Sequence, residues 1–531
     1  MALTVTSNGD TVPYIVRREI GTINRGVYDI EFLHQPGQPL PMPWIRPTPG
    51  WNGRLVYVFG GGCGAGYHQG VLEGAIGSHN EPFLSEGYAV ATSTLNTAST
   101  DCNDRISAET LSMVKEHFIK SYGVPIHTIG SGGSGGAINQ LLIAQNYPGL
   151  LNGLILSLSF PDFVTNLQSM TDCPLLERAF NESRHAWAEE QKSAVSGFAT
   201  WRTCTVGWSD YRGRGRGHYW EMLEPNKNCP PLIALLGVRC DLFANEVNIF
   251  GRNALTGLAY RPIDNVGVQY GLAAFNRGQI DTDQFIALNA HIGGYDGDGH
   301  IVAQRTKADF ESLRNTYERG LVLTGGGGLA EVPIIDERPY TDDEANQHDS
   351  FRSFATRARL IAANGSALNQ VILRYPRVSA MDLLQVIQGT EVFYDREREL
   401  IRKMNHWLDN ISADTTERTR AHKLARAKPA DLADSCWATD GEQVNEPASY
   451  GGSGRCNQLY PPHGDPRIAA GGPLSDDILK CALKPVRAED YARALSAEEL
   501  GQLKAIFPEG VCDYTRPGTG QEVTRTVWQK F

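Results

Sequence analysis

The stretch Ile126-His127-Thr128-Ile129-Gly130-Ser131-Gly132-Gly133-Ser134-Gly135-Gly136-Ala137 decides the fold. Residues 126–129 have the character of a short strand, and a helical pattern runs from Ala137 to Gln145. Between them, the chain reads G-x-S-x-G, centred on Ser134. A serine on so sharp a strand-to-helix turn needs small residues two places before and after it, because larger side chains would clash. The stretch therefore predicts a nucleophile elbow with Ser134 at its tip.

Strand and helix patterns alternate on both sides of this turn. Short apolar runs at 54–59, 88–94 and 154–158 are typical of buried parallel strands. A helix is expected between the second run and the elbow, with Ser107 as its N-cap. The alternation returns at 332–335 and 371–375. The order predicts an α/β-hydrolase fold, with a mostly parallel sheet covered by helices on both faces.

A break in the alternation divides the chain. Residues 1–164 and 326–412 are expected to form the two parts of the core, and residues 165–325 an inserted cap. Residues 413–531 are rich in loops and predict a segment that wraps the surface. The cap carries an aromatic cluster that forms either its own core or a pocket for an apolar substrate. The cluster consists of Trp201, Trp208, Tyr211, Tyr219 and Trp220.

Composition excludes several classes of protein. The chain has 531 residues and a net charge of -11, whereas a nucleic-acid-binding protein would need a basic face. No stretch approaches the roughly 18 apolar residues of a membrane span. The expected partner is a small-molecule or polymeric ester. No metal and no organic cofactor is expected.

A second glycine-rich loop follows the strand at 54–59. In this fold, the loop in this position donates a main-chain N–H to the oxyanion hole, and glycines let the backbone approach the substrate. The predicted oxyanion hole consists of Gly135 and one of Gly61, Gly62 and Cys63. His68 lies just downstream and could reach the pocket.

The serine needs a base and the base an orienting acid. The loop directly after the strand at 371–375, where the base usually lies, begins at residues 376–379 without a histidine. His348 is the best replacement, because it lies on the loop after the strand at 332–335; His463 is the second candidate. Asp342 and Asp162 are equally good candidates for the acid, and Asp336 is weaker.

Two other functions remain open. Gly130, Gly132 and Gly135 also spell G-x-G-x-x-G, which would suit an NAD-linked oxidoreductase. However, the next strand ends in no acidic residue for a ribose hydroxyl. The missing late histidine also leaves room for a non-catalytic binding protein on a hydrolase scaffold.

The sequence resembles a bacterial family of exported α/β-hydrolases that is distantly similar to the tannase and feruloyl esterase group. The resemblance extends over nearly the whole chain, and it implies a serine esterase with Ser134 as its nucleophile. The tannase group joins its triad through cysteines that flank the serine and the histidine, and neither Ser134 nor His348 has such a neighbour. The matching stretches are 59–70, 102–104, 107–110, 264–272 and 477–485.

The ten cysteines predict a disulfide framework and export to the periplasm or the medium. The first residues show no signal peptide, so the exported form would be a mature chain with a replaced start; a cytoplasmic location stays open. Five pairs are expected: Cys63–Cys102, Cys173–Cys204, Cys229–Cys240, Cys436–Cys456 and Cys481–Cys512. The sequence thus predicts a Ser-His-Asp hydrolase that cleaves an ester, or less favourably an amide.

Overall fold

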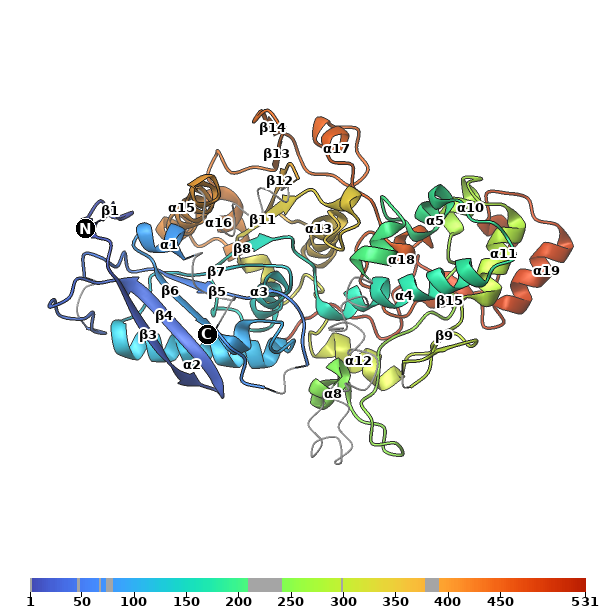
Figure 1. Ribbon diagram of the computed structural model, residues 1–531, viewed down its shortest axis with the longest axis horizontal. Helices are drawn as coiled ribbons and strands as arrows, with labels where there is room; N and C mark the ends of the chain where they lie inside the picture. Colours follow the sequence, from blue (N-terminus) through green and yellow to red (C-terminus); the bar gives the residue numbers. More distant parts are fainter. Residues whose placement is uncertain are drawn as a thin grey trace.

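A twisted, mostly parallel sheet of ten strands forms the centre of one lobe, and a largely helical lobe adjoins it (Figure 1). The computed structural model describes residues 2–44, 48–65, 68–72, 80–208, 241–297, 299–377 and 391–531. The strands, in spatial order, are β14 (Gln443–Asn445), β13 (Ser435–Trp437), β12 (Gln370–Tyr375), β11 (Ile334–Pro339), β8 (Gly153–Ser157), β7 (Thr128–Gly133), β5 (Leu55–Val58), β6 (Ala89–Ser93), β4 (Gly26–Leu33) and β3 (Val16–Ile23).

The strand order has a switch point between β5 and β7. From β5 the chain moves to β6 on one side, and it then returns to β7, which pairs with β5 on the other side. Strands β13 to β6 are parallel neighbours, whereas β14, β4 and β3 are antiparallel at the edges. In an open α/β sheet, ligands bind at such a switch point, beyond the carboxyl ends of the strands.

Helices cover both faces of the sheet because successive strand residues point to opposite sides. In β5, Leu55 and Tyr57 join the core on one face, whereas Val56 joins the core on the other. The second core also contains Met404 and Trp407, one turn apart on a long helix. The helices of this lobe are α1 (Glu81–Ser85), α2 (Asp104–Tyr122), α3 (Gly135–Asn146), α13 (Phe351–Asn364), α15 (Glu391–Ala413) and α16 (Arg420–Ala427).

The inserted segment forms most of the second lobe. Helix α4 (Phe163–Glu182) leads into it from the carboxyl end of β8 (Figure 1). Its other elements are α5 (Glu189–Ser196), η2 (Thr203–Gly207), α8 (Leu242–Asn245), α9 (Val247–Phe250), α10 (Leu272–Asn276), α11 (Thr282–His291), β9 (Gly294–Tyr295), β10 (Ile301–Val302) and α12 (Phe310–Glu318).

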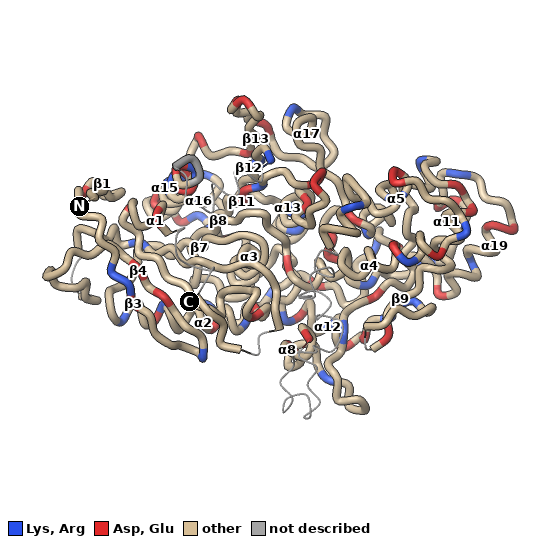
Figure 2. The backbone as a smooth tube through the Cα atoms, viewed as in Figure 1, with Lys and Arg blue, Asp and Glu red and all other residues tan. Residues whose placement is uncertain are grey.

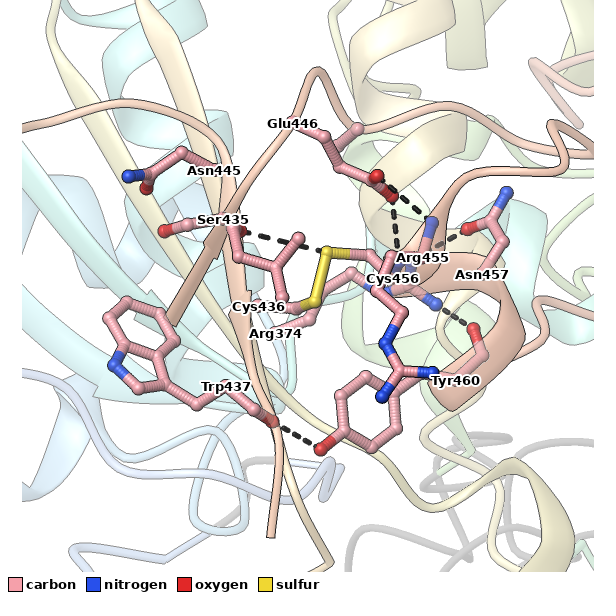
Figure 3. The surroundings of a disulfide bond; sticks show 12 residues. Arg374, Ser435, Cys436, Trp437, Asn445, Glu446, Arg455, Cys456, Asn457 and Tyr460 are labelled. Carbon is pink, nitrogen blue, oxygen red and sulfur yellow. Dashed lines mark hydrogen bonds between the residues drawn. A yellow bond between two sulfur atoms is a disulfide. The ribbon is translucent and has the colours of Figure 1, made fainter. Parts of the chain in front are cut away.

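The C-terminal segment does more than wrap the surface. Strands β13 and β14 extend the sheet, and α18 (Pro466–Ala469) and α19 (Ala497–Ile506) pack against α4 and α11 of the cap. Figure 3 shows how Cys436 of β13 is joined to Cys456 of α17 (Arg455–Leu459). The segment therefore completes both lobes. Its remaining strands, β15 (Ala482–Lys484) and β16 (Val511–Asp513), form an antiparallel two-stranded sheet.

Four disulfides lie within the described residues. They are Cys63–Cys102, Cys173–Cys204, Cys436–Cys456 and Cys481–Cys512, and these four of the five predicted pairings are confirmed. The predicted pair Cys229–Cys240 lies outside the described residues. Disulfides of this number are consistent with an oxidising compartment.

The α/β-hydrolase fold is confirmed, and one predicted helix start is wrong. Helix α2 begins at Asp104, capped by Asn103, whose side chain accepts from the N–H groups of Arg105 and Ile106. Ser107 is buried inside the helix. Acidic and basic residues are interspersed along both lobes (Figure 2). Within the described ranges, no helix combines the length and apolar character that crossing a bilayer requires.

Candidate active site

Ser134 occupies a strained turn between β7 and α3. Its backbone has φ 55° and ψ -122°, a conformation that L-residues rarely adopt. The turn is held because the N–H of Ser134 donates to the carbonyl of Ser157 in β8, and its own carbonyl accepts from Ala137 and Ile138. The serine side chain is thereby fixed at the N-terminus of α3, where the helix dipole favours a developing negative charge.

Two glycines make this turn compatible with the neighbouring strand. A Cβ atom at Gly132 would lie 2.3 Å from the carbonyl oxygen of Phe59, and one at Gly136 would lie 2.4 Å from the same atom. Phe59 directly follows β5. The small residues that the sequence pattern requires are therefore needed for close packing of backbone against backbone.

The glycine-rich loop after β5 is fastened to the segment after β6. Gly60 and Gly64 donate to the carbonyls of Asn96 and Ala98, and the N–H of Ser99 donates to Gly61. The Cys63–Cys102 disulfide locks the same two segments.

This loop borders the elbow. A Cβ atom at Gly61 would lie 3.5 Å from the Cβ of Ser134. The N–H groups of Gly61, Gly62 and Gly135 have no hydrogen-bond acceptor within the described residues. They are thus free to bind a negatively charged oxygen beside the serine.

His348 meets Ser134 from the loop between β11 and α13. Its Nε2 atom lies 3.0 Å from the Oγ of Ser134, and its Nδ1 atom lies 2.7 Å from the Oδ1 of Asn346. The imidazole packs on the ring of Phe160, with ring centroids 5.1 Å apart. Phe160 belongs to the segment that follows β8.

The loop that carries His348 is anchored on several sides. The carbonyl of His348 accepts from Thr341 and Arg338, and Ser350 donates its N–H and its hydroxyl to Asp342. The cap also contacts the loop, because a Cβ atom at Gly207 of η2 would lie 2.6 Å from the carbonyl oxygen of Ala345.

The surroundings of His348 favour the neutral imidazole. Desolvation, together with the positive charges of Arg338 and Arg352, lowers the pKa of His348 from 6.5 to about 3. A neutral ring leaves one nitrogen able to accept a proton. His348 is therefore in the form that a general base requires at neutral pH.

Neither aspartate predicted as the acid reaches His348. Asp342 accepts from the N–H and the hydroxyl of Ser350, and it makes no hydrogen bond with the ring of His348. Asp162 caps α4 through Thr165 and is paired with Arg359 at 2.6 Å. The weaker candidate Asp336 accepts from Ser159 and Gln370. Each carboxylate is held by donors of its own, so the expected Ser-His-Asp contact is not formed.

The two other candidate histidines, His68 and His463, do not pair with Ser134. His68 is exposed, and its ring accepts from the N–H of Gly70. His463 lies near Asp342, whose pKa is raised by burial against the opposing effects of Ser350 and His463. Neither ring contacts Ser134 within the described residues.

A buried carboxyl group directly follows His348 in the chain. Asp349 is fully buried, and neither of its oxygens has a hydrogen-bond partner within the described residues. Burial and the nearby charge of Asp342 raise its pKa well above the usual range, so the carboxyl group is favoured in its protonated form.

Asn346 and the aromatic packing of His348 were not among the features predicted from the sequence. An asparagine two residues before His348 is the signal that could have revealed the first, because such side chains bind their own backbone two residues on. The described members of the predicted aromatic cluster pack on different residues. Trp201 packs on Phe180, whereas Trp208 packs on Phe160, which also contacts His348. Tyr211, Tyr219 and Trp220 lie outside the described residues.

An elbow serine at the switch point of this sheet, beside a glycine-rich loop, defines the chain as an α/β-hydrolase-fold protein. The model of the tannase-like family of unknown function (DUF6351) matches residues 1–523. The chain belongs to this tannase-like family. None of the curated proteins compared with it matches.

Three of the solved structures that match the chain have low sequence identity to it. Feruloyl esterase B from Aspergillus oryzae is 12% identical, with a TM-score of 0.32, over 66% of this chain and 71% of that one. An α/β hydrolase enzyme from a Medee basin deep-sea metagenome library is 12% identical, with a TM-score of 0.28, over 71% and 96%. Oligopeptidase B from Leishmania major is 13% identical, with a TM-score of 0.21, over 28% of this chain and only 20% of that one.

Proposed function

We propose that the protein is a serine hydrolase that cleaves an ester bond through an acyl-enzyme intermediate. The observation that carries the proposal is the 3.0 Å contact between the Oγ of a strained elbow serine, Ser134, and the Nε2 of His348. Membership of a tannase-like family supports it. The free N–H groups beside the serine supply the third element that acyl transfer needs.

In acylation, Oγ of Ser134 attacks the ester carbonyl carbon while its proton passes to Nε2 of His348. The carbonyl π electrons move to oxygen, and the N–H groups of Gly135 and of one of Gly61, Gly62 and Cys63 stabilise that charge. When the tetrahedral intermediate collapses, the bond to the alcohol oxygen breaks. His348 then returns its proton to the leaving alcohol, and an acyl group stays on Ser134.

Deacylation repeats these steps with water. The water loses a proton to Nε2 of His348 and attacks the acyl carbon, and the bond to Oγ of Ser134 then breaks. Oγ takes back the proton, and the carboxylic acid leaves. An ester is favoured over an amide because an alcohol departs more easily than an amine and esters are the commoner substrates of this fold.

Close packing argues against the dinucleotide alternative. Gly132 and Gly135, which would face a pyrophosphate, instead face the carbonyls of Phe59 and Gly62, at 2.3 Å and 2.1 Å from where a Cβ would lie. Only a test of whether Ser134 reacts distinguishes a hydrolase from the alternative, a binding protein on a hydrolase scaffold. We further propose that the protein works in the periplasm or outside the cell, as its disulfides suggest.

The test is labelling with a fluorophosphonate probe and hydrolysis of p-nitrophenyl acetate and butyrate, with a p-nitroanilide for comparison. We expect the parent to be labelled, and Ser134→Ala and His348→Ala to lose labelling and at least about 10³-fold in kcat. Ser131→Ala, three residues earlier on β7, is the matched control and should be labelled like the parent.

Labelling that persists in Ser134→Ala would show that another nucleophile reacts. A parent that neither labels nor turns over either ester would refute the proposal and favour a binding function. Hydrolysis of the anilide at a rate similar to that of the esters would change the proposed substrate from ester to amide.

A further inference from the structure

The amide of Asn346 occupies the place that a carboxylate holds in a Ser-His-Asp triad. Its Oδ1 atom lies 2.7 Å from Nδ1 of His348 and 3.0 Å from the main-chain nitrogen of the same residue. Both contacts come from one side-chain atom.

The double contact fixes the orientation of the amide and the tautomer of the ring. A main-chain N–H can only donate, so the atom that it contacts must be the amide oxygen and not the amide nitrogen. An oxygen can only accept, so Nδ1 of His348 must carry the proton. The lone pair of the neutral ring then lies on Nε2, which faces the Oγ of Ser134.

No carboxylate shares this task in the described part of the chain. No hydrogen bond or ion pair joins His348 to an acidic side chain there. Of the acidic groups closest in sequence, Asp342 binds Ser350, and neither oxygen of Asp349 makes a hydrogen bond within the described residues.

The turn that carries Asn346 is built to hold this position. Ala345, before it, has φ 60°, a left-handed conformation that ends the short helix η5 (Asp342–Glu344). Gly207 of the cap lies against the same turn, since a Cβ there would lie 3.2 Å from the carbonyl carbon of Asn346. The main chain of this turn is therefore packed from the cap side as well as held by its own loop.

We propose that Asn346 is the positioning residue of a Ser-His-Asn triad, orienting His348 through Nδ1 without supplying a negative charge. The proposal rests on the proposed function. It has one electrostatic consequence: the imidazolium formed during acylation receives a dipole and not a full opposite charge, so the base stays weak. The guanidinium groups near the ring act in the same direction on the pKa of His348.

Three variants test the assignment: Asn346→Ala, Asn346→Asp and, as a matched control far from the site, Asn410→Ala on α15. We expect Asn346→Ala to lose about 10²-fold or more in kcat with little change in KM, because the ring is misplaced while the substrate site remains. Asn346→Asp should retain catalysis but move the acid limb of the pH profile of kcat/KM upward by at least about one unit, because a carboxylate stabilises the charged ring. Asn410→Ala should match the parent in both.

A spectroscopic measurement that does not depend on catalysis shows directly whether Asn346 binds Nδ1 of His348. In the Ser134→Ala background, the Nδ1 proton of His348 should give a downfield proton resonance. Asn346→Ala should remove that resonance, and Asn346→Asp should move it further downfield, since a charged acceptor makes a shorter bond.

A kcat for Asn346→Ala within about threefold of the parent would overturn the assignment, as would a pH profile that is unchanged in Asn346→Asp. The orienting role would belong to a carboxylate if Asp342→Asn or Asp162→Asn lowered kcat in a folded protein and Asn346→Ala did not. If Asn346→Ala does not fold, Asn346→Asp and the proton resonance decide. Failure of the proposed function is distinct, because the parent itself would then not react with the fluorophosphonate.

Discussion

The Oγ of Ser134 lies 3.0 Å from Nε2 of His348, although 214 positions separate the two residues in the chain. They meet because β7, which ends at the serine, pairs with β8, and β8 pairs with β11, which leads to the histidine loop. The contact therefore depends on the register of three parallel strands. It forms only when the sheet is complete.

The pKa of His348 predicts activity that persists in acid. A base works only in its neutral form, and with a pKa lowered to about 3 the imidazole stays neutral well below pH 6.5. We expect kcat/KM for a p-nitrophenyl ester to stay level down to about pH 4 and then to fall as the ring takes up a proton. Circular dichroism at each pH is the control for unfolding. Loss of half the activity near pH 6.5 in a folded protein would contradict the prediction.

Packing at the elbow predicts that Gly136→Ala is severely destabilising. The new Cβ would lie 2.4 Å from the carbonyl oxygen of Phe59, an approach that only movement of β5 or α3 could relieve. We expect a loss of about 3 kcal/mol or more in urea unfolding and loss of fluorophosphonate labelling. Gly501→Ala is the matched control, because nothing lies within 4 Å of its Cβ and alanine favours the interior of α19. It should stabilise the protein by up to about 1 kcal/mol.

The disulfides predict separable losses of activity and stability. Removal of Cys63–Cys102, which closes 39 residues, and of Cys436–Cys456, which closes 20, should each cost about 3–4 kcal/mol on the chain-entropy account. Only the first holds the glycine-rich loop beside Ser134. Cys63→Ala with Cys102→Ala should therefore lower kcat in the folded protein, whereas Cys436→Ala with Cys456→Ala should leave kcat unchanged while lowering the unfolding midpoint. Equal kcat values for the two double variants would refute the distinction.

The buried carboxyl group of Asp349 predicts a pH-dependent gain in stability on substitution. The pKa of Asp349 is raised in the folded protein, whereas in the unfolded chain this carboxyl group releases its proton above about pH 4. The free energy of unfolding of the parent therefore decreases as the pH rises above that value. Asp349→Asn should therefore stabilise the protein more at pH 8 than at pH 4 in urea unfolding. Asp343→Asn, exposed on the same loop, should change the unfolding free energy little at either pH. An equal effect of Asp349→Asn at both pH values would contradict the prediction.

Local residue types explain why the elbow could be predicted from the sequence. Gly132, Ser134 and Gly136 encode the turn through small size alone, and the flanking strand and helix patterns fix its context. The start of α2 shows the limit of local signals. Asn103 and Ser107 are both good N-cap residues, and the choice is made by packing, because Ser107 is buried against the side chain of Asn96.

Non-local pairing explains most of what the sequence could not supply. Strands β13 and β14 have three residues each, too few for a periodic pattern, and they exist because β12 offers an edge. The contact of Asn346 with His348 is local, but the expectation of a carboxylate directed attention to Asp342. That aspartate lies on the same loop but binds Ser350 instead of the ring, which residue types alone do not show.

The cap of this protein is not an interchangeable module. Gly207 lies against the turn that holds Asn346, and its element η2 is joined to α4 by the Cys173–Cys204 disulfide. Replacing the cap with that of a relative, a common route to new specificity in enzyme engineering, would remove a segment that packs against the loop of His348. Substrate range in this scaffold would then have to change by single substitutions within the cap, with the residues around Gly207 retained.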